Sequence, residues 1–279
     1  MVPNPRAPNR LGRVDLSPDK VDCIVFWTKN PAPMLDKLDR IEAMGHKFYF
    51  QFTLTAYGKT IERNVPPETE LTSVFAELAH RLGPERIVWR YDPVLLDSAH
   101  SIHWHYEHFY GLCEKLHPFT HRCIVSFIHP YRHIANRFQK VLPEDRIAVA
   151  SELPKIAGKY GLSLFACAEE TDLMEYGVGR SSCIDLELIE QLVGYGIRAR
   201  KDTGQRPACT CIESVDIGIY DTCTNECAYC YATTNPNTAL RRSLNHDPDA
   251  PMLTGYPAGD EIIRDRTTKS QKTHQLRIF

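Results

Sequence analysis

The sequence predicts an α/β fold, and three observations support this prediction. Apolar runs rich in β-branched and aromatic residues alternate along the chain with segments of helical periodicity, which indicates a parallel sheet covered by helices. The length of 279 residues fits one barrel of about 250 residues. Polar residues follow several predicted strands, where barrels and open α/β sheets place their active sites. We expect a TIM-like (β/α) barrel, either incomplete or permuted with the cysteine-bearing strand last; an open doubly wound sheet is the alternative.

The predicted elements alternate between strands and helices. The first helix has an apolar stripe over 35–44 and is ended by Gly45, and the helix over 68–82 keeps the 3.6-residue period most clearly. Further helices are predicted over 103–117, 151–160 and 185–193. Strands are predicted over 21–27, 49–55, 87–91, 123–128, 162–167 and 215–220.

Composition and charge exclude several classes of protein. The formal net charge is -2, so no overall attraction to nucleic acid or anionic lipid is expected. No apolar run is long enough to cross a bilayer, and the N-terminus lacks the apolar core of a signal peptide. We therefore expect a soluble cytoplasmic protein without a membrane partner. We divide it into a barrel over 1–235, which includes a cysteine cluster loop at 209–231, and a C-terminal extension over 236–279.

Ten cysteines are present, and five of them lie between positions 209 and 230. Clustered cysteines with short spacings usually hold a metal, and Cys223, Cys227 and Cys230 form the pattern C-x3-C-x2-C. Thiolates are ligands of iron–sulfur clusters, and three ligands in one loop would leave one iron open for a substrate or cofactor. The rival is structural zinc, because Cys227 and Cys230 form one knuckle and Cys209 with Cys211 could form another.

The motif resembles the C-x3-C-x-aromatic-C signature of radical S-adenosylmethionine enzymes, with Tyr229 in the aromatic position. The resemblance implies a [4Fe-4S] cluster on Cys223, Cys227 and Cys230, S-adenosylmethionine on the open iron, and Tyr229 beside its adenine. It also implies a 5′-deoxyadenosyl radical and an electron donor such as flavodoxin or ferredoxin. In that superfamily the motif normally follows the first barrel strand, whereas here it lies near the end of the sequence, which indicates a permuted arrangement.

A second resemblance covers nearly the whole chain. Several long motifs occur in the order found in the bacterial family called domain of unknown function 1848: VDCIVFWTKNPAPML, YFQFTLT, ERIVWRYDPVLL, CAEE, SCID, SVDIGIYDTC and CAYCYA. The family has a C-terminal cysteine cluster like that of radical enzymes. Its members typically begin with a further strand and helix containing a Ser-Arg-Arg-Thr-Asp stretch, so the resemblance implies that this chain starts late.

Candidate site residues follow the predicted strands. Lys29 and Asn30 come after the first strand, and we expect them to bind a cofactor together with the aromatic residue of the cysteine motif. Arg90 and Asp92 end the third strand two positions apart, which places them on one face. With Glu169, after the fifth strand, they are the candidate catalytic residues. The alternatives are a structural ion pair between Arg90 and Asp92 and an exposed Glu169.

Four further cysteines predict a second metal site. Cys167, Cys183, Cys209 and Cys211 lie at strand ends or in loops and not inside an apolar helix or strand, where a cysteine usually packs as a small apolar residue. Four thiolates could close around an auxiliary iron–sulfur cluster or a zinc ion. The alternatives are free thiols, or Cys209 or Cys211 as the fourth ligand of the first cluster, which would block S-adenosylmethionine.

Four histidines also occur close together, at positions 100, 103, 105 and 108. They do not share one narrow stripe of a helix, and aromatic residues interleave with them. We interpret them as a solvated helix face and not as a metal site.

Taken together, the motifs predict an iron–sulfur protein, namely a radical S-adenosylmethionine-type enzyme acting on a small-molecule or macromolecular substrate that the sequence does not identify. An electron-transfer or redox-sensing iron–sulfur protein and a zinc-stabilised binding module are the alternatives, and fold class does not choose among them.

Overall fold

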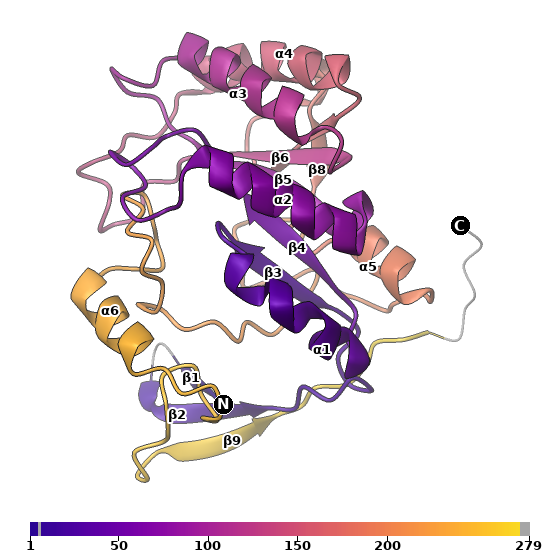
Figure 1. The fold of residues 1–279 in the computed structure, drawn as a ribbon, viewed down its shortest axis with the longest axis vertical. Helices are drawn as coiled ribbons and strands as arrows, with labels where there is room; N and C mark the ends of the chain where they lie inside the picture. Colours follow the sequence, from indigo (N-terminus) through magenta and orange to yellow (C-terminus); the bar gives the residue numbers. More distant parts are fainter. Residues whose placement is uncertain (5–6, 274–279) are drawn as a thin grey trace.

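The computed structural model describes residues 1–4 and 7–273, and its main feature is a six-stranded sheet in which all neighbouring strands are parallel (Figure 1). The strands lie side by side in the order in which they follow one another in the sequence. They are β3 (Ile24–Thr28), β4 (Phe48–Thr53), β5 (Ile87–Val94), β6 (Arg122–Phe127), β7 (Ser163–Cys167) and β8 (Gly179–Ser181). The predicted α/β class is therefore confirmed.

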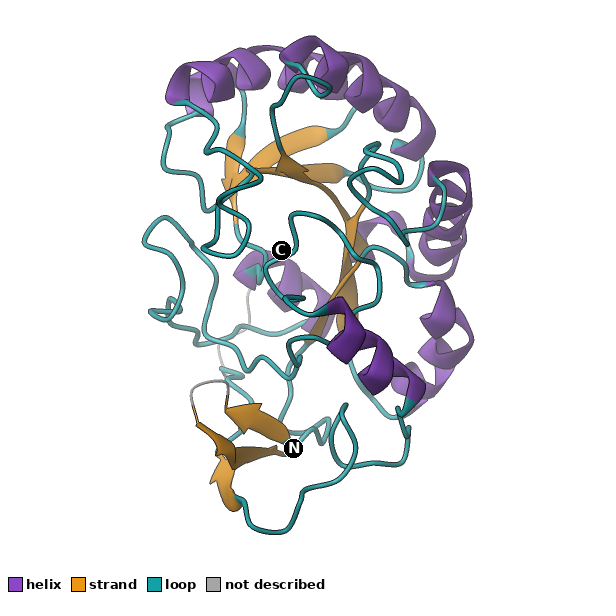
Figure 2. Ribbon diagram, turned by 90° about the vertical axis from the view of Figure 1, so that its left-hand side faces the viewer, coloured by secondary structure: helices purple, strands orange, loops and turns teal. Residues whose placement is uncertain are grey.

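Four helices cover one face of this sheet: α1 (Leu38–Ala43), α2 (Glu68–Leu82), α3 (Ile102–Leu116) and α4 (Pro143–Lys159). Successive residues of a strand point to opposite faces, so Phe48, Phe50 and Phe52 of β4 all point toward the helices and are fully buried there. The short helices η1 (Ala32–Lys37), η2 (Pro84–Arg86) and η3 (Met174–Tyr176) lie in the connections. Figure 2 shows an arc of helices on the outer side of the curved sheet.

The sheet is not closed, so a complete TIM-like barrel is not present. β3 and β8 are its two edges, and the described residues contribute no strand between them. The predicted strand over 215–220 was wrong, because this segment is an irregular loop. The Asp216 carboxylate accepts a hydrogen bond from the Gly218 N–H at 2.8 Å, which turns the chain locally. The Tyr220 side chain is 48% exposed, so the segment lacks the burial that would stabilise a central strand.

A second, smaller core lies on the opposite face of the sheet. The helix α5 (Leu186–Val193) packs Leu188 and Ile189 against Tyr49 of β4, Val88 of β5 and Ile124 of β6. Each of these three strand residues lies near the amino end of its strand, so α5 fills that half of the inner face. The carboxyl half of the same face is left to polar side chains and cysteines.

Strands from near the two ends of the described chain pair in a separate three-stranded sheet (Figure 1). β2 (Ala7–Val14) pairs with β1 (Val2–Asn4) in antiparallel fashion and with β9 (Ile262–Arg266) in parallel fashion. The helix α6 (Pro236–Leu244) precedes β9. The predicted C-terminal extension is therefore joined to the beginning of the chain. Within the part that the structure describes, no helix combines the length and apolarity needed to span a membrane.

The histidines of α3 differ from the predicted solvated face. His103 does point to solvent, with a side chain 79% exposed, but His105 is fully buried. The hydroxyl of Tyr91 lies 2.8 Å from His105 Nδ1, and His105 Nε2 lies 2.7 Å from the Leu95 carbonyl. Because a carbonyl can only accept, Nε2 carries the proton and Nδ1 accepts from Tyr91. Burial lowers the pKa of His105 to about 4, which keeps the ring neutral.

We expect this buried histidine to make stability depend on pH. In the unfolded chain His105 binds a proton below about pH 6.5, whereas in the folded chain it does so only below about pH 4. The free energy of unfolding is therefore not reduced by His105 above pH 6.5. Below pH 6.5 protonation favours the unfolded chain, and the free energy of unfolding falls by about 3 kcal/mol as the pH drops to 4. Urea unfolding across this range should show a shallower pH dependence in His105→Gln, and an unchanged one in the control His103→Gln. Identical profiles for wild type and His105→Gln would contradict the assignment.

Candidate functional site

The cysteines of the C-x3-C-x2-C motif lie in a loop whose base is closed by one carboxylate. The Asp221 N–H donates to the Ala232 carbonyl at 2.8 Å, and Asp221 Oδ1 accepts from the backbone N–H groups of Thr234, at 2.6 Å, and Asn235, at 2.9 Å. Burial would raise the pKa of Asp221, but these N–H donors lower it. Asp221 itself adopts a left-handed conformation, with φ of 55°, which turns the chain into the loop. We call residues 221–235 the three-cysteine loop.

The three-cysteine loop docks on the connection between β4 and α2. The Ala228 N–H donates to the Ile61 carbonyl at 2.8 Å, and the Asn64 N–H donates to the Asn225 carbonyl at 3.0 Å. The Asn64 side-chain amide also donates to the Thr224 carbonyl at 2.9 Å. On the other side, His133 Nε2 lies 2.8 Å from the Cys230 carbonyl. Backbone contacts therefore hold the loop at the carboxyl end of the sheet, where parallel α/β folds place their active sites.

The three thiols of this loop are free and near the surface. Cys223 is exposed, whereas Cys227 and Cys230 are partly buried. Burial raises the pKa of the Cys227 thiol to about 12, and the Lys29 ammonium opposes this rise. Burial likewise raises the pKa of Cys223, and the charge of Cys230 adds to the effect. The thiols are therefore close enough to interact with one another.

Among residues 1–4 and 7–273, no set of three or more His, Cys, Asp or Glu side chains converges to hold a single metal ion. The three thiolates of an iron–sulfur cubane each bind a different iron atom, so they are not expected to converge on one point.

A buried ion pair lies directly beneath the three-cysteine loop. Lys29 Nζ lies 2.8 Å from Glu62 Oε1, and their side chains are only 9% and 4% exposed. The same carboxylate oxygen accepts hydrogen bonds from the Thr55 hydroxyl, at 2.6 Å, and from the Tyr229 hydroxyl. Glu62 also forms an antiparallel backbone bridge with Cys227. One carboxylate thus joins the end of β3, the end of β4 and the three-cysteine loop.

The predicted cofactor-binding residues fall into two groups. Lys29 and Tyr229 come together at Glu62, with the Lys29 ammonium 5.6 Å from the centre of the Tyr229 ring. Asn30 is engaged elsewhere, because its Oδ1 accepts from the Ala32 N–H at 3.0 Å and so fixes the start of η1. A role in cofactor binding stays a prediction for all three.

The substitution Tyr229→Phe distinguishes the role of the Tyr229 hydroxyl in stability from the role of its ring in the three-cysteine loop. Loss of the hydrogen bond to Glu62 should lower the free energy of unfolding by about 1–2 kcal/mol, because a charged buried acceptor loses one donor. The ring is retained, so bound iron after reconstitution should be unchanged. Urea unfolding and an iron assay measure the two effects. The control is Tyr256→Phe, whose exposed hydroxyl donates to Asp247 and should matter little. Loss of bound iron in Tyr229→Phe would contradict the expectation that the hydroxyl contributes to stability only.

Arg90 and Asp92 form the ion pair that was the alternative to a catalytic role. Arg90 is only 5% exposed, and its Nη2 lies 2.5 Å from Asp92 Oδ2. Arg90 Nη1 reaches Gln51 Oε1 at 3.4 Å and donates to Cys183 Sγ at 2.9 Å. Since Gln51 and Arg90 lie on the inner face of the sheet, this pair belongs to the carboxyl half that α5 leaves uncovered. Catalysis by Arg90 or Asp92 stays a prediction.

Three of the four cysteines predicted to form a second metal site come together beside Arg90. Cys167 Sγ lies 2.9 Å from Cys183 Sγ, and Cys211 Sγ lies near them, where it accepts a hydrogen bond from the Ile184 N–H, next to Cys183, at 3.4 Å. The contact with Cys167 holds the pKa of Cys183 well below its usual value, and the nearby Cys211 acts in the same direction. Cys209 is buried, and no hydrogen bond among the described residues joins its thiol to the others. We call Cys167, Cys183 and Cys211 the thiol triad.

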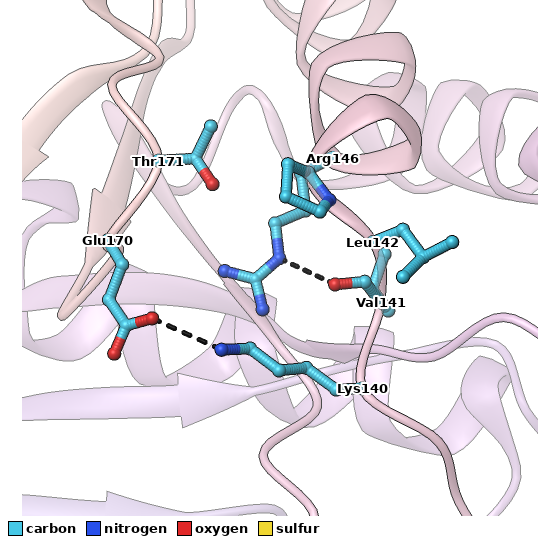
Figure 3. A pocket seen from close by; sticks show the side chains of 7 residues that line it. Lys140, Val141, Leu142, Arg146, Glu170 and Thr171 are labelled. Carbon is cyan, nitrogen blue, oxygen red and sulfur yellow. Dashed lines mark hydrogen bonds and ion pairs between the residues drawn. The ribbon is translucent and has the colours of Figure 1, made fainter.

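Glu169 lies at a different place from the other candidate residues. Its carboxylate pairs with Arg146 in a buried ion pair and accepts from the Thr171 N–H at 2.8 Å. The neighbouring cavity, of about 360 Å³, contains the Lys140–Glu170 pair at 3.2 Å and the hydrogen bond from Arg146 Nε to the Val141 carbonyl (Figure 3). Both cations of this cavity are neutralised by carboxylates, and its lining includes no residue of the three-cysteine loop. A catalytic role of Glu169 stays a prediction.

Three residues that the sequence did not indicate as site residues form hydrogen bonds with the three-cysteine loop. Glu62, Asn64 and His133 contact it from connections that follow β4 and β6. These connections have no periodic pattern, and Glu62 is 167 positions from the tyrosine whose hydroxyl it accepts. The only available signal was their position after predicted strands.

The fold and site define an α/β protein with a cysteine loop docked at the carboxyl end of a parallel sheet. The model of domain of unknown function 1848 matches residues 1–232, and the chain belongs to this family. Searches of curated proteins and of solved structures gave no significant match.

Proposed function

We propose that this protein is an iron–sulfur protein that holds a [4Fe-4S] cluster through Cys223, Cys227 and Cys230 and acts as a radical S-adenosylmethionine-type enzyme. The docking of the three-cysteine loop at the carboxyl end of the sheet carries this proposal. When bound, the cluster would supply the electron that cleaves S-adenosylmethionine. The substrate is a small molecule or a macromolecule that enters the same end of the sheet.

The chemistry of the donors supports the proposal. The three thiols are free, none is fully buried, and they are spaced along one loop as in the radical S-adenosylmethionine signature. The Lys29 ammonium lowers the pKa of both Cys223 and Cys227 against the effect of burial, and so favours their thiolate forms. Backbone hydrogen bonds hold the loop on one side, the His133 imidazole holds it on the other, and Glu62 accepts a hydrogen bond from its Tyr229. Fixing the ligands in advance in this way lowers the entropy lost on binding.

We further propose that the six strands are part of a (β/α) barrel in which the three-cysteine loop lies over the carboxyl ends. The sequential order of parallel strands and the helices on one face support this arrangement. A crystal structure of the reconstituted protein tests it, and a flat, doubly wound sheet would exclude it.

The deciding experiment is anaerobic reconstitution with iron and sulfide. We expect a brown protein with about four irons per chain, and formation of 5′-deoxyadenosine when dithionite and S-adenosylmethionine are added. A reduced flavodoxin or ferredoxin should replace dithionite as the electron donor.

Two other outcomes would each overturn the proposal. A brown protein that forms no 5′-deoxyadenosine would be an electron-transfer or redox-sensing protein. A colourless protein with one tightly bound zinc ion would be a zinc-stabilised module.

A further inference from the structure

The thiol triad lies outside the three-cysteine loop and has no part in the proposed function. Cys167 ends β7, and Cys183 follows β8, the strand that pairs with β7 in parallel register. Pairing of the two strands therefore places the two thiols at the same end of the sheet, with 2.9 Å between their sulfur atoms. Cys211 reaches them from the loop that precedes the three-cysteine loop, where its sulfur accepts from the Ile184 N–H at 3.4 Å.

The separation of the two sulfurs favours a direct bond over a shared metal ion. Two thiolates about 2.3 Å from one tetrahedral zinc ion lie roughly 3.8 Å apart. Cys167 and Cys183 are closer than this, at 2.9 Å, so a metal ion does not fit between them in this arrangement. A disulfide bond is about 2.05 Å long, so the two sulfur atoms need to move less than about 1 Å closer to form one.

We propose that Cys167 and Cys183 are a reversible disulfide site that exchanges with low-molecular-weight disulfides such as oxidised glutathione. The Cys183 thiolate attacks one sulfur of the small disulfide, whose S–S bond breaks, and the first small thiolate leaves and takes up a proton. Cys167 then loses its proton to solvent and attacks Cys183 Sγ. The mixed disulfide breaks, and the second small thiolate leaves and takes up a proton from solvent. Two protein thiols are thereby oxidised to one disulfide, and one small disulfide is reduced to two thiols.

Exposure and charge assign the attacking role to Cys183. Cys183 is partly exposed, whereas Cys167 is only 6% exposed, so a dissolved disulfide meets Cys183 first. The Arg90 guanidinium donates to Cys183 Sγ at 2.9 Å and so stabilises its thiolate. After the disulfide has formed, Cys183 has no charge and Arg90 retains Asp92 as its anionic partner. The oxidation state of the pair therefore changes the charge at the carboxyl end of the sheet.

Trypsin digestion provides a direct test, because cleavage after Lys159, Arg180 and Arg198 places Cys167 and Cys183 in two peptides with one cysteine each. The full chain is treated anaerobically with oxidised glutathione, alkylated and digested, and the peptides are identified by mass. We expect the peptides 160–180 and 181–198 to be joined, and dithiothreitol to separate them. The joined pair should also form in a Cys223→Ala/Cys227→Ala/Cys230→Ala variant, so the result is independent of the proposed function.

Matched variants complete the test. Cys183→Ser should abolish the joined peptides, whereas Cys113→Ser, which changes a buried cysteine of α3, should leave them unchanged. Recovery of Cys167 and Cys183 fully alkylated would overturn the proposal, as would a disulfide from either of them to Cys211. A stoichiometric zinc ion that persists in the triple variant and is lost in Cys183→Ser would show instead that the thiol triad is a metal site.

Discussion

Replacement of Cys227 by alanine is expected to abolish iron binding at the three-cysteine loop while the sheet stays folded. Cys227 is the middle cysteine of the motif, and its backbone forms the bridge to Glu62, which the substitution leaves in place. Loss of one of three thiolates leaves two ligands, too few to hold a cubane with one open corner. The fold should persist because the large apolar core is built from the strands and from α1 to α4, and Cys227 only touches its margin.

Iron and sulfide analysis after anaerobic reconstitution measures the first effect, and far-ultraviolet circular dichroism with urea unfolding measures the second. The free energy of unfolding of the iron-free protein should fall by no more than about 1 kcal/mol, as expected for a small side chain removed from a partly exposed position. Cys23→Ala is the matched control, because Cys23 is also partly buried but lies before β3, away from the loop. Full iron content in Cys227→Ala would refute the ligand assignment, and gross unfolding would make the metal structural.

The elements with strong periodicity could be predicted from the sequence. The helix predicted over 68–82 has the bounds of α2, because five apolar residues repeat with the helical period and Gly83 follows. Weakly patterned elements were missed or shortened. β8 has only three residues, Gly179–Ser181, and no apolar alternation. α4 starts at Pro143, eight positions before the predicted start, because its first two turns carry charged residues and little apolar periodicity.

The candidate site was predictable where spacing along the chain reflects the chemistry, and not where folding brings distant residues together. The proposed ligand motif is local, so the sequence alone is enough to predict Cys223, Cys227 and Cys230 as ligands. The thiol triad joins positions 167, 183 and 211, and the predicted set included Cys209, which the described contacts leave apart. No sequence pattern separates Cys209 from Cys211, because the two lie only two positions apart in the same loop. Both are buried, and the conformation of the loop decides which of them lies near Cys167 and Cys183.

Lys29→Met is expected to produce a large loss of stability, because it leaves the Glu62 carboxylate buried without a cation. Removing one partner of a buried ion pair costs about 3–5 kcal/mol, since the remaining charge has lost its compensation. The hydroxyl groups of Thr55 and Tyr229 still donate to Glu62, which favours the lower end of this range. A melting temperature about 10 °C lower is expected for a chain of this size. Glu62→Gln should destabilise similarly, by leaving the Lys29 ammonium uncompensated.

The double variant Lys29→Met/Glu62→Gln distinguishes an ion pair from two independent packing contributions. If the charges interact, the double variant should be more stable than the less stable single variant, because no uncompensated charge remains. The matched control is the surface pair Lys155 and Glu152, whose side chains are 66% and 43% exposed. Lys155→Met should change the free energy of unfolding by less than about 1 kcal/mol, because water screens an exposed pair. Urea unfolding of the full set measures the coupling between Lys29 and Glu62. Additive effects of the two substitutions would show that the pair does not stabilise the fold, and Glu62 would then support the three-cysteine loop only through Tyr229 and the backbone.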